Sequence, residues 1–261
     1  MSKEITLGER IKQYESASTI KLSPRSYVLV RLDGKKFSKY TKKVEKPFDS
    51  GLSDDMIETA RQLCSELQCC RMAYTQSDEI SLLFTDFENI KSQQLYDGRV
   101  DKINSIAASL ATTIFNNLRL KRAISEEGFK LDSFIWANFD SRAFLIPNPN
   151  DVLNYFLWRQ QDCTRNSVSM AGQAQFSHKE LQGKNGGQIQ DKLMLEKGIN
   201  WNDYEVRFKR GTVIARKEYE KEPGVKRSRW EALEPPIFSK DWTFLSSIVP
   251  VYENKLFQLE E

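Results

Sequence analysis

The chain has 261 residues and a formal net charge of +3, with 39 Lys and Arg residues against 36 Asp and Glu residues. A hydrophobic fraction of 39% with 12 Gly and 8 Pro excludes the disordered and collagen-like classes of protein, and the length suits one large domain or two small ones. The longest apolar runs are far shorter than the ~20 residues of a membrane-spanning helix, and the N-terminal residues lack the apolar segment of a signal peptide, so we expect a cytoplasmic protein that does not bind membranes.

The first predicted elements are a strand and a helix. Residues 27–32 form a short apolar run that ends at Asp33 and Gly34, which is typical of a buried strand that stops at a turn. A lysine-rich connection follows, and apolar residues then recur at helical spacing over residues 53–67. Acidic residues occupy the first turn of this segment, which favours the start of a helix, and the apolar spacing predicts that the helix is amphipathic.

A hairpin and a second long helix are predicted next. Residues 71–75 and 80–85 are short β-prone runs that flank four polar residues, which places Asp78 and Glu79 at the tip of a β-hairpin. Apolar residues then recur at helical spacing over residues 99–118. This spacing predicts a helix with one buried face.

The later part of the chain is less regular. Residues 133–147 predict a strand pair or one bent strand, and residues 151–162 predict a third helix. Residues 183–190 are polar and Gly-rich, which favours a mobile loop. Two short strand-like runs follow, at residues 206–210 and 211–219.

The order of elements over residues 26–146 is strand, helix, strand, strand, helix, strand. This order is typical of the split βαββαβ, or ferredoxin-like, arrangement. The fold class is then α+β, with two helices covering one face of an antiparallel sheet.

Three acidic residues are expected at one edge of this sheet. The first strand and the central hairpin are neighbours in a βαββαβ sheet, so Asp33 can approach Asp78 and Glu79. Unpaired carboxylates repel one another and their hard oxygen donors match Mg²⁺, so the pattern indicates a magnesium site for two-metal phosphoryl or nucleotidyl transfer. Each acidic site alone also fits ordinary turn chemistry, because Asp and Gly favour turns.

Cysteine and histidine offer little catalytic chemistry. Cys64, Cys69, Cys70 and Cys163 contain no CxxC pair, so we predict reduced thiols that serve in packing. The one histidine, His178, excludes a His-rich metal site, and we assign it no role.

Positive charge is concentrated in two segments. Residues 31–46 carry seven Lys and Arg against two acidic residues, and residues 205–229 carry nine against four, so each segment has a local charge of +5. The first cluster follows Asp33 directly, so residues 34–38 can contact a triphosphate, with Lys46 as a mobile ammonium. Each cluster also fits an ordinary solvated face.

Four sequence blocks give the chain a family resemblance. They are RLDGKKF at residues 31–37, KPFD at 46–49, YTQSDEISLLF at 74–84 and WRQQDCTRNS at 158–167. In this order and spacing they resemble the blocks of the tRNA-His guanylyltransferase superfamily. The resemblance implies a polymerase-palm-like catalytic domain that adds nucleotides to the 5′ end of tRNA in the 3′-to-5′ direction. It implies such a domain over residues 1–170, with an extension over residues 171–261 that packs on it and contacts RNA and other subunits.

The resemblance also implies roles for individual residues. Asp33 and Asp78 would be the carboxylate ligands of two Mg²⁺ ions, with the Gly34 carbonyl as a further ligand and Glu79 as a supporting catalytic acid. ATP, GTP and other nucleoside triphosphates would be substrates. The residues implied in nucleotide binding are Asp33, Gly34, Lys35, Lys36, Phe37, Ser38, Lys46, Ser77, Asp78 and Asn166.

The fourth block departs from the eukaryotic pattern. Eukaryotic members carry His-Ile-Asn-Asn after Asp-Cys, whereas this chain has Thr164, Arg165, Asn166 and Ser167. This block looks like that of the bacterial and archaeal guanylyltransferase-like proteins. Their chemistry implies template-dependent repair of tRNAs that lack 5′ nucleotides, with ATP activation of 5′-monophosphate ends. Guanosine addition to histidine tRNA is the other activity of the superfamily.

The resemblance gives the second basic segment a partner. The resemblance implies that this segment contacts the tRNA backbone, and such binding should weaken as salt rises. Members of the family assemble as tetramers, so the resemblance also implies a homotetramer. The residues expected to contact RNA are Arg207, Lys209, Arg210, Arg216, Lys217, Lys226, Arg227 and Arg229. Two alternatives remain open: a nucleotidyl cyclase-like signalling palm, and a non-catalytic RNA-binding module that retains the fold.

Overall fold

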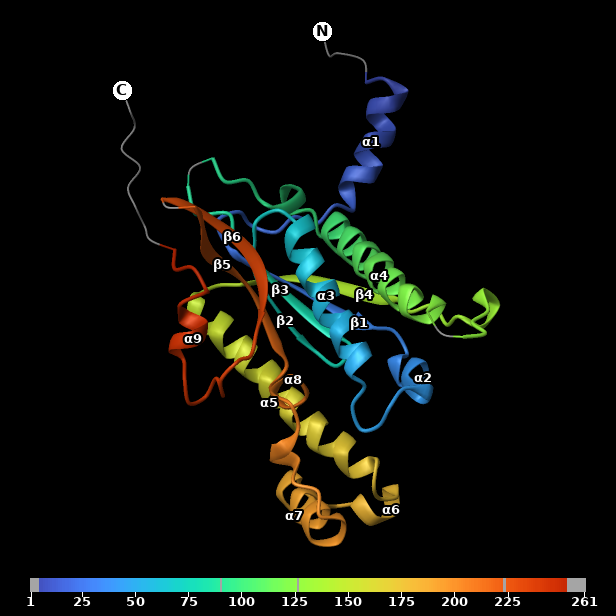
Figure 1. Ribbon diagram of the computed structural model, residues 1–261. Coiled ribbons are helices and arrows are strands. Elements are labelled where there is room, and N and C mark those ends of the chain that lie inside the picture. The colour runs from blue at the N-terminus through green and yellow to red at the C-terminus, as the bar shows by residue number, and fades with distance from the viewer. Residues whose placement is uncertain (1–4, 90, 126, 223, 253–261) are drawn as a thin grey trace.

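The computed structural model describes residues 5–89, 91–125, 127–222 and 224–252 (Figure 1). Its strands are β1 (Tyr27–Gly34), β2 (Cys70–Gln76), β3 (Glu79–Phe84), β4 (Phe139–Ile146), β5 (Thr212–Glu222) and β6 (Val225–Leu233). Its α-helices are α1 (Leu7–Ala17), α2 (Phe37–Tyr40), α3 (Ser50–Glu66), α4 (Val100–Ile124), α5 (Pro149–Gln173), α6 (His178–Leu181), α7 (Gly186–Lys197), α8 (Val206–Arg210) and α9 (Thr243–Ser246). Within these ranges every helix is too short or too polar to span a bilayer.

All six strands belong to one antiparallel sheet, in the order β4-β1-β3-β2-β5-β6. The first four strands have the order expected of a βαββαβ fold, so the predicted α+β class is confirmed. The β5–β6 hairpin extends the sheet beyond β2 and comes from the C-terminal part of the chain. The extension predicted from residue 171 is therefore built into the sheet, and its expected boundary falls within α5.

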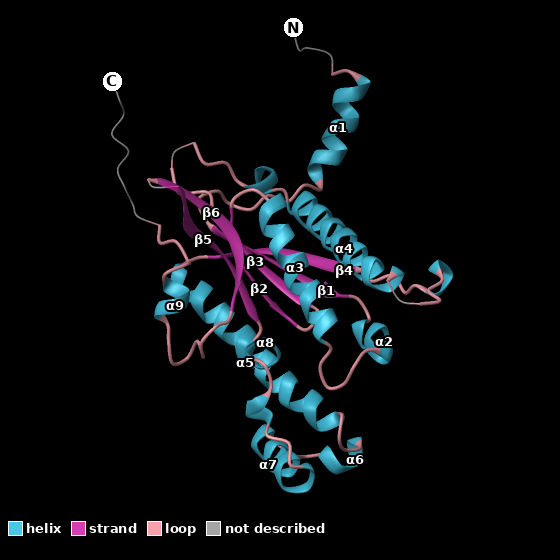
Figure 2. Ribbon diagram, in the orientation of Figure 1, coloured by secondary structure: helices cyan, strands magenta, loops and turns pink. Residues whose placement is uncertain are grey.

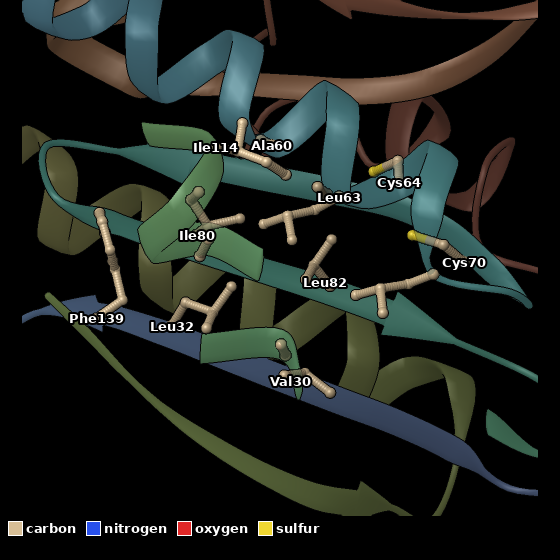
Figure 3. Packing of buried hydrophobic residues seen from close by; sticks show 14 of the residues in the cluster. Val30, Leu32, Ala60, Leu63, Cys64, Cys70, Ile80, Leu82, Ile114 and Phe139 are labelled. Carbon is tan, nitrogen blue, oxygen red and sulfur yellow. The ribbon is translucent and has the colours of Figure 1, made fainter. Parts of the chain in front are cut away.

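Helices α3 and α4 lie side by side over one face of the sheet (Figures 1 and 2). Strand residues alternate between faces, so Val30, Leu32, Ile80 and Leu82 all point toward these helices. Figure 3 shows them beneath Leu63 of α3, in a cluster of fully buried apolar side chains. Burying one such side chain stabilises the fold by roughly 1.5–3 kcal/mol relative to leaving it exposed, so this cluster contributes much of the stability.

Helix α5 covers the opposite face of the sheet. Tyr27 and Leu29 of β1 and Tyr74 of β2 pack there against Phe156 of α5. Asn148 caps this helix by accepting a hydrogen bond from the backbone N–H of Asp151, and Pro149 occupies the first turn. The third predicted helix is thus confirmed but is much longer than expected, and helices cover both faces of the sheet.

Three local predictions were wrong. Residue 133 ends a 3-10 helix and residues 134–138 belong to no strand, so the segment contains neither a strand pair nor one bent strand over its whole length, but only β4. The Gly-rich segment predicted as a loop contains the start of α7, because Asn185 and Gln188 form a reciprocal capping box. The run at residues 206–210, predicted as a strand, is the short helix α8.

The cysteines match their prediction. All four thiols are free, and Cys64, Cys70 and Cys163 are buried. Burial raises the pKa of Cys64 well above its usual value and that of Cys163 to about 12. Cys64 and Cys163 therefore remain protonated at neutral pH and serve in packing.

Candidate active site

The ends of β1 and β3 bring the predicted acidic residues together. Asp33 lies directly opposite Glu79 in the β1–β3 ladder, and the backbone N–H of Gly34 donates to the carbonyl of Asp78 at 3.1 Å. On its other side Asp33 lies opposite Asp140 of β4. Because strand residues alternate, Asp33 and Glu79 point to the sheet face that α5 covers.

Asp78 is held in a two-residue turn between the paired Gln76 and Glu79. Ser77 takes the left-handed conformation in this turn, with φ of 49°, and its hydroxyl donates to the Asp78 carboxylate at 3.1 Å. Burial raises the pKa of Asp78, and the negative charge of Asp33 raises it further. Two carboxylates are therefore close enough to repel each other where water screens them poorly.

Glu79 belongs to a different set of contacts. Its carboxylate lies 3.3 Å from the guanidinium of Arg159 on α5, and it accepts a hydrogen bond from the Ser81 hydroxyl at 3.3 Å. Arg159 also forms an ion pair with Asp162 one helical turn later. Burial raises the pKa of Glu79, whereas the positive charges of Arg159 and Arg31 oppose that shift.

The expectation of one cluster of three carboxylates therefore needs correction. Among the described residues, no group of three or more His, Cys, Asp and Glu side chains is arranged to hold a metal ion. Arg159 neutralises Glu79, which leaves Asp33 and Asp78 as the acidic pair without such a partner. Two carboxylates with a backbone carbonyl are still a donor set of hard oxygen atoms that suits Mg²⁺, which keeps several waters.

Gly34 is required by close packing. A Cβ at this position would lie 2.2 Å from Cδ2 of Phe37. The Phe37 ring cannot move aside, because it is buried between Phe115 and Phe139. Any side chain at position 34 would therefore displace the core beneath the candidate metal site.

The residues expected to bind phosphate divide into two groups. Lys35, Lys36 and Ser38 are exposed, whereas the Phe37 side chain belongs to the core. The expected cradle of backbone amides is incomplete, because the N–H of Gly34 bonds to Asp78 and that of Lys35 bonds to the carbonyl of Asn138 at 2.8 Å. Two of the five amides are thus engaged, and the exposed lysine side chains remain available for phosphate.

A pocket of about 80 Å³ opens beside the Ser77–Asp78 turn. It brings Ser77 and Asn166, which are far apart in sequence, into one lining. Lys46 does not line this pocket; its ammonium is exposed and donates to the carbonyl of Thr41 at 3.0 Å. Other lining residues include Phe48, Asp49, Arg207 and Phe208.

The aromatic residues of the pocket were missed by the sequence prediction. The rings of Phe48 and Phe208 are stacked at 4.8 Å with an angle of 6° between their planes. Phe48 lies inside the KPFD block, but its partner lies about 160 residues away in α8. Arg159 was missed as well, although its position one helical turn before Asp162 in the WRQQDCTRNS block was a signal.

The residues expected to bind RNA are distributed over two elements. Arg207 and Lys209 of α8 are engaged inside the protein, the first with Asp54 and Glu205 and the second with the carbonyl of Asn202. The carbonyl of Arg210 accepts a hydrogen bond from the Tyr74 hydroxyl at 2.7 Å. The exposed residues of the set are those on the β5–β6 hairpin, namely Arg216, Lys217, Lys226, Arg227 and Arg229.

Comparison with known proteins gives the same family in sequence and in structure. The sequence model of the tRNAHis guanylyltransferase (Thg1) family matches residues 8–147. A bacterial tRNA(His) guanylyltransferase-like protein in complex with ATP has 41% identity and a TM-score of 0.84, over 94% of this chain and 99% of that chain. A bacterial protein of the same description in complex with GTP has 39% identity and a TM-score of 0.78, over 93% and 98% of the two chains.

A eukaryotic relative is more distant than these bacterial structures. The tRNA(His) guanylyltransferase of Schizosaccharomyces pombe is 32% identical over 226 residues, which is 82% of each chain. The resemblance carried by the four sequence blocks is thus confirmed by a family match that covers three of them and by a structural match over nearly the whole chain. The chain belongs to the tRNAHis guanylyltransferase family of nucleotidyltransferases.

Proposed function

We propose that this protein extends the 5′ end of tRNA in the 3′-to-5′ direction and repairs tRNAs that lack 5′ nucleotides, each incoming nucleotide being chosen by pairing with the opposite strand. The observation that carries the proposal is that the Asp33–Asp78 pair and the pocket lined by Asn166 adjoin through the Ser77–Asp78 turn. Family membership supports the reaction class. The altered block around Asn166 and the higher identity to bacterial relatives support repair over guanosine addition to histidine tRNA.

Two Mg²⁺ ions are part of the proposal. Asp33, Asp78 and the carbonyl of Gly34 would hold them, and a cation would offset the repulsion between the two partly buried carboxylates. Bound there, the ions would activate the attacking hydroxyl and stabilise charge on the phosphates. Glu79 acts as a positioning residue, because its contact with Arg159 fixes the end of β3 next to Asp78.

The pocket is the proposed site of the nucleotide base. Phe48 and Phe208 line the pocket with aromatic surface that a base can contact, and Asn166 and Asp49 offer hydrogen-bonding groups. Lys35, Lys36 and Lys46, all exposed, would contact the triphosphate. The complexes of the bacterial relatives with ATP and GTP support this assignment of substrates.

The proposed reaction proceeds without a covalent bond to the protein. In the first step an oxygen of the RNA 5′-monophosphate attacks the α-phosphorus of ATP, and pyrophosphate leaves. In the second step the 3′-hydroxyl of the incoming nucleotide attacks the RNA 5′ phosphorus, and AMP leaves. A 5′-triphosphorylated RNA needs only the second step, with pyrophosphate as the leaving group.

The RNA contact, the assembly and the location remain proposals. The exposed basic residues of the β5–β6 hairpin would bind the tRNA backbone, which predicts affinity that falls as salt rises. We also propose a cytoplasmic homotetramer. Helix α1 supports assembly, because it has no buried residue and exposes Leu7, Ile11 and Tyr14.

Extension of labelled tRNA tests the proposal. The protein is incubated with Mg²⁺, ATP, all four nucleoside triphosphates and either full-length tRNA or tRNA that lacks its first nucleotide. We expect extension of the truncated tRNA alone, by the nucleotide complementary to the opposite base. Asp78→Ala should abolish extension, whereas Asp191→Ala, at an exposed position on α7, should leave it unchanged.

Two outcomes would contradict the proposal. Addition of guanosine regardless of the opposite base would indicate the histidine-tRNA activity of the family. Conversion of a nucleoside triphosphate to a cyclic product with no change in the RNA would favour the nucleotidyl cyclase alternative.

A further inference from the structure

A second, strongly basic groove lies next to the candidate active site. It has a volume of about 430 Å³ and is separate from the nucleotide pocket, with which it shares no lining residue. One wall comes from the segment after β1 and the other from the irregular segment before β4. The lining residues are Lys35, Lys36, Lys39, Tyr40, Lys42, Lys43 and residues 135–138.

The charge of this groove is uncompensated. Its lining contains five lysines and no acidic residue. In the part of the chain that the structure describes, these lysines form no ion pair. A concave surface with several unpaired ammonium groups attracts a polyanion such as a nucleic acid.

The groove also presents an exposed tryptophan. Trp136 is 56% exposed, although an indole of this size is usually largely buried. Its ring packs against Phe134 in an edge-to-face arrangement, with 4.8 Å between ring centroids. Trp136 therefore offers a supported aromatic surface to solvent.

The backbone around Trp136 is firmly held. The side-chain amide of Asn116 on α4 accepts from the N–H of Ala137 and donates to its carbonyl, both at 2.9 Å. The next carbonyl, of Asn138, accepts from the N–H of Lys35 at 2.8 Å. The backbone that follows Trp136 is thus held beside the lysines, which keeps the tryptophan at this wall of the groove.

The position of the groove relates it to the reacting end of the substrate. Lys35 follows Gly34 directly, and Gly34 lies opposite Phe139 in the β1–β4 ladder. The groove therefore begins where β1 ends, one residue after Gly34 and two residues after Asp33. A nucleic acid whose end lies at the Asp33–Asp78 pair can continue into the groove.

We propose that the groove binds the RNA substrate next to its 5′ end, with phosphates at Lys39, Lys42 and Lys43 and an unpaired base stacked on Trp136. This inference rests on the proposed function. A tRNA that lacks 5′ nucleotides leaves the opposite bases unpaired, and an aromatic side chain beside lysines is a suitable platform for such bases. The base of the nucleoside triphosphate has its own pocket and its phosphates are assigned to Lys35 and Lys36 next to β1, so Lys39, Lys42, Lys43 and Trp136 are the part of the groove left for the RNA.

Binding measurements test the groove separately from catalysis. The affinity of the full-length protein for 5′-truncated tRNA is measured across a range of salt concentrations without nucleotides. Trp136→Ala should weaken binding roughly 5- to 150-fold, as expected for the loss of one stacked base, and Trp136→Phe should restore most of it. The triple variant K39A/K42A/K43A should reduce the slope of log affinity against log salt by about 2.

Matched controls distinguish this effect from a general loss of charge or of an aromatic surface. K179A/K184A/K240A removes three exposed lysines elsewhere, and Trp242→Ala removes another partly exposed indole. Both controls should bind tRNA like the wild type. The KM for the nucleoside triphosphate should be unchanged in Trp136→Ala, because Trp136 does not line the nucleotide pocket.

The outcomes separate the two proposals. Unchanged tRNA affinity and salt slope in both groove variants would overturn the groove, whether or not the wild type extends tRNA. Weakened binding in these variants, with a wild type that fails to extend tRNA, would support the groove and overturn the proposed reaction. A wild type that does not bind tRNA at all would overturn both.

Discussion

The guanidinium of Arg159 lies 3.3 Å from the carboxylate of Glu79, and both side chains are almost fully buried between α5 and the sheet. The pair joins the helix that carries the WRQQDCTRNS block to the strand that follows Asp78. It therefore couples the two parts of the candidate active site. Removing either partner would leave a buried charge without its counterpart.

Arg159→Met should destabilise the protein by about 3–5 kcal/mol, because it leaves the Glu79 carboxylate buried and unpaired. Loss of the guanidinium charge should raise the pKa of Glu79 further, so the cost should be larger at pH 8 than at pH 5, where the carboxyl can be protonated. Urea unfolding at the two pH values measures this. An equal loss of unfolding free energy at pH 5 and pH 8 would contradict this account of the Glu79 charge.

Two further variants isolate the effect of the buried charge. Glu79→Gln combined with Arg159→Met should recover much of the lost stability, because no unpaired charge remains. Arg165→Met removes an exposed arginine that pairs with the same Asp162 at 2.8 Å. This exposed pair should contribute less than about 1 kcal/mol.

Asp78→Asn should abolish activity and still make the protein more stable at neutral pH. The pKa of Asp78 is raised above its usual value of 3.8, mainly by burial and also by Asp33, so ionising this carboxyl is harder in the folded protein than in the unfolded chain. The wild type therefore loses stability as pH rises from the unfolded pKa of Asp78, about 3.9, through its higher folded pKa. Below about pH 3.9 the carboxyl is protonated in both states and this loss is absent. The gain in Asp78→Asn should follow the same pH dependence.

Magnesium should offset the loss of stability that the ionised Asp78 carboxyl causes in the wild type. If Asp33 and Asp78 hold the ions, adding Mg²⁺ should raise the melting temperature of the wild type by mass action and have little effect on Asp78→Asn. Thermal unfolding with and without Mg²⁺ measures both. A similar Mg²⁺ response in the two proteins would place the cation elsewhere.

Gly211→Ala should destabilise the protein by about 3 kcal/mol, because the backbone conformation is nearly exclusive to glycine. Its φ is 73° and its ψ is −166°. An added Cβ would lie 2.6 Å from both the carbonyl oxygen of Thr75 and the hydroxyl of Tyr74. Gly198→Ala is the control, with a positive φ of 66° and no neighbour within 4 Å, and should cost about 1 kcal/mol. Equal losses in chemical denaturation would argue against the clash.

The β5–β6 hairpin gives a prediction about RNA affinity. Lys226 and Arg227 are exposed near its tip, so replacing both by alanine should reduce the salt slope of tRNA binding by roughly 1.5. Lys209→Ala should instead lower stability, because this lysine is buried and bonded to the carbonyl of Asn202. Binding titrations and thermal unfolding distinguish these effects. A Lys209→Ala protein that is as stable as the wild type but binds RNA more weakly would show that Lys209 contacts RNA and does not serve stability.

The strand order and the acidic edge could be predicted because their signals are local. An apolar run that stops at Asp33 and a hairpin with Asp78 and Glu79 at its tip define where the strands end, and the βαββαβ order then sets which strands are neighbours. In the structure these strand ends do meet, and Asp33 lies opposite Glu79.

The features that the sequence did not predict depend mostly on contacts between residues far apart in the chain, or on segments too short to show a clear periodicity. The role of Arg159 depends on a strand about 80 residues earlier, and the stacking of Phe48 depends on α8. A five-residue run such as residues 206–210 is too short for its periodicity to distinguish a helix from a strand. The start of α7 was missed because the glycines outweighed the capping signal of Asn185 and Gln188.

The β5–β6 hairpin also determines where the sheet ends. Without it, the edge would be β2, whose residues are almost all buried and whose unpaired backbone groups would be open to another chain. With it, the edge is β6, which carries exposed Lys226, Arg227 and Arg229. Like charges on an outer strand oppose pairing with a second copy, so the hairpin protects the sheet against edge-to-edge aggregation.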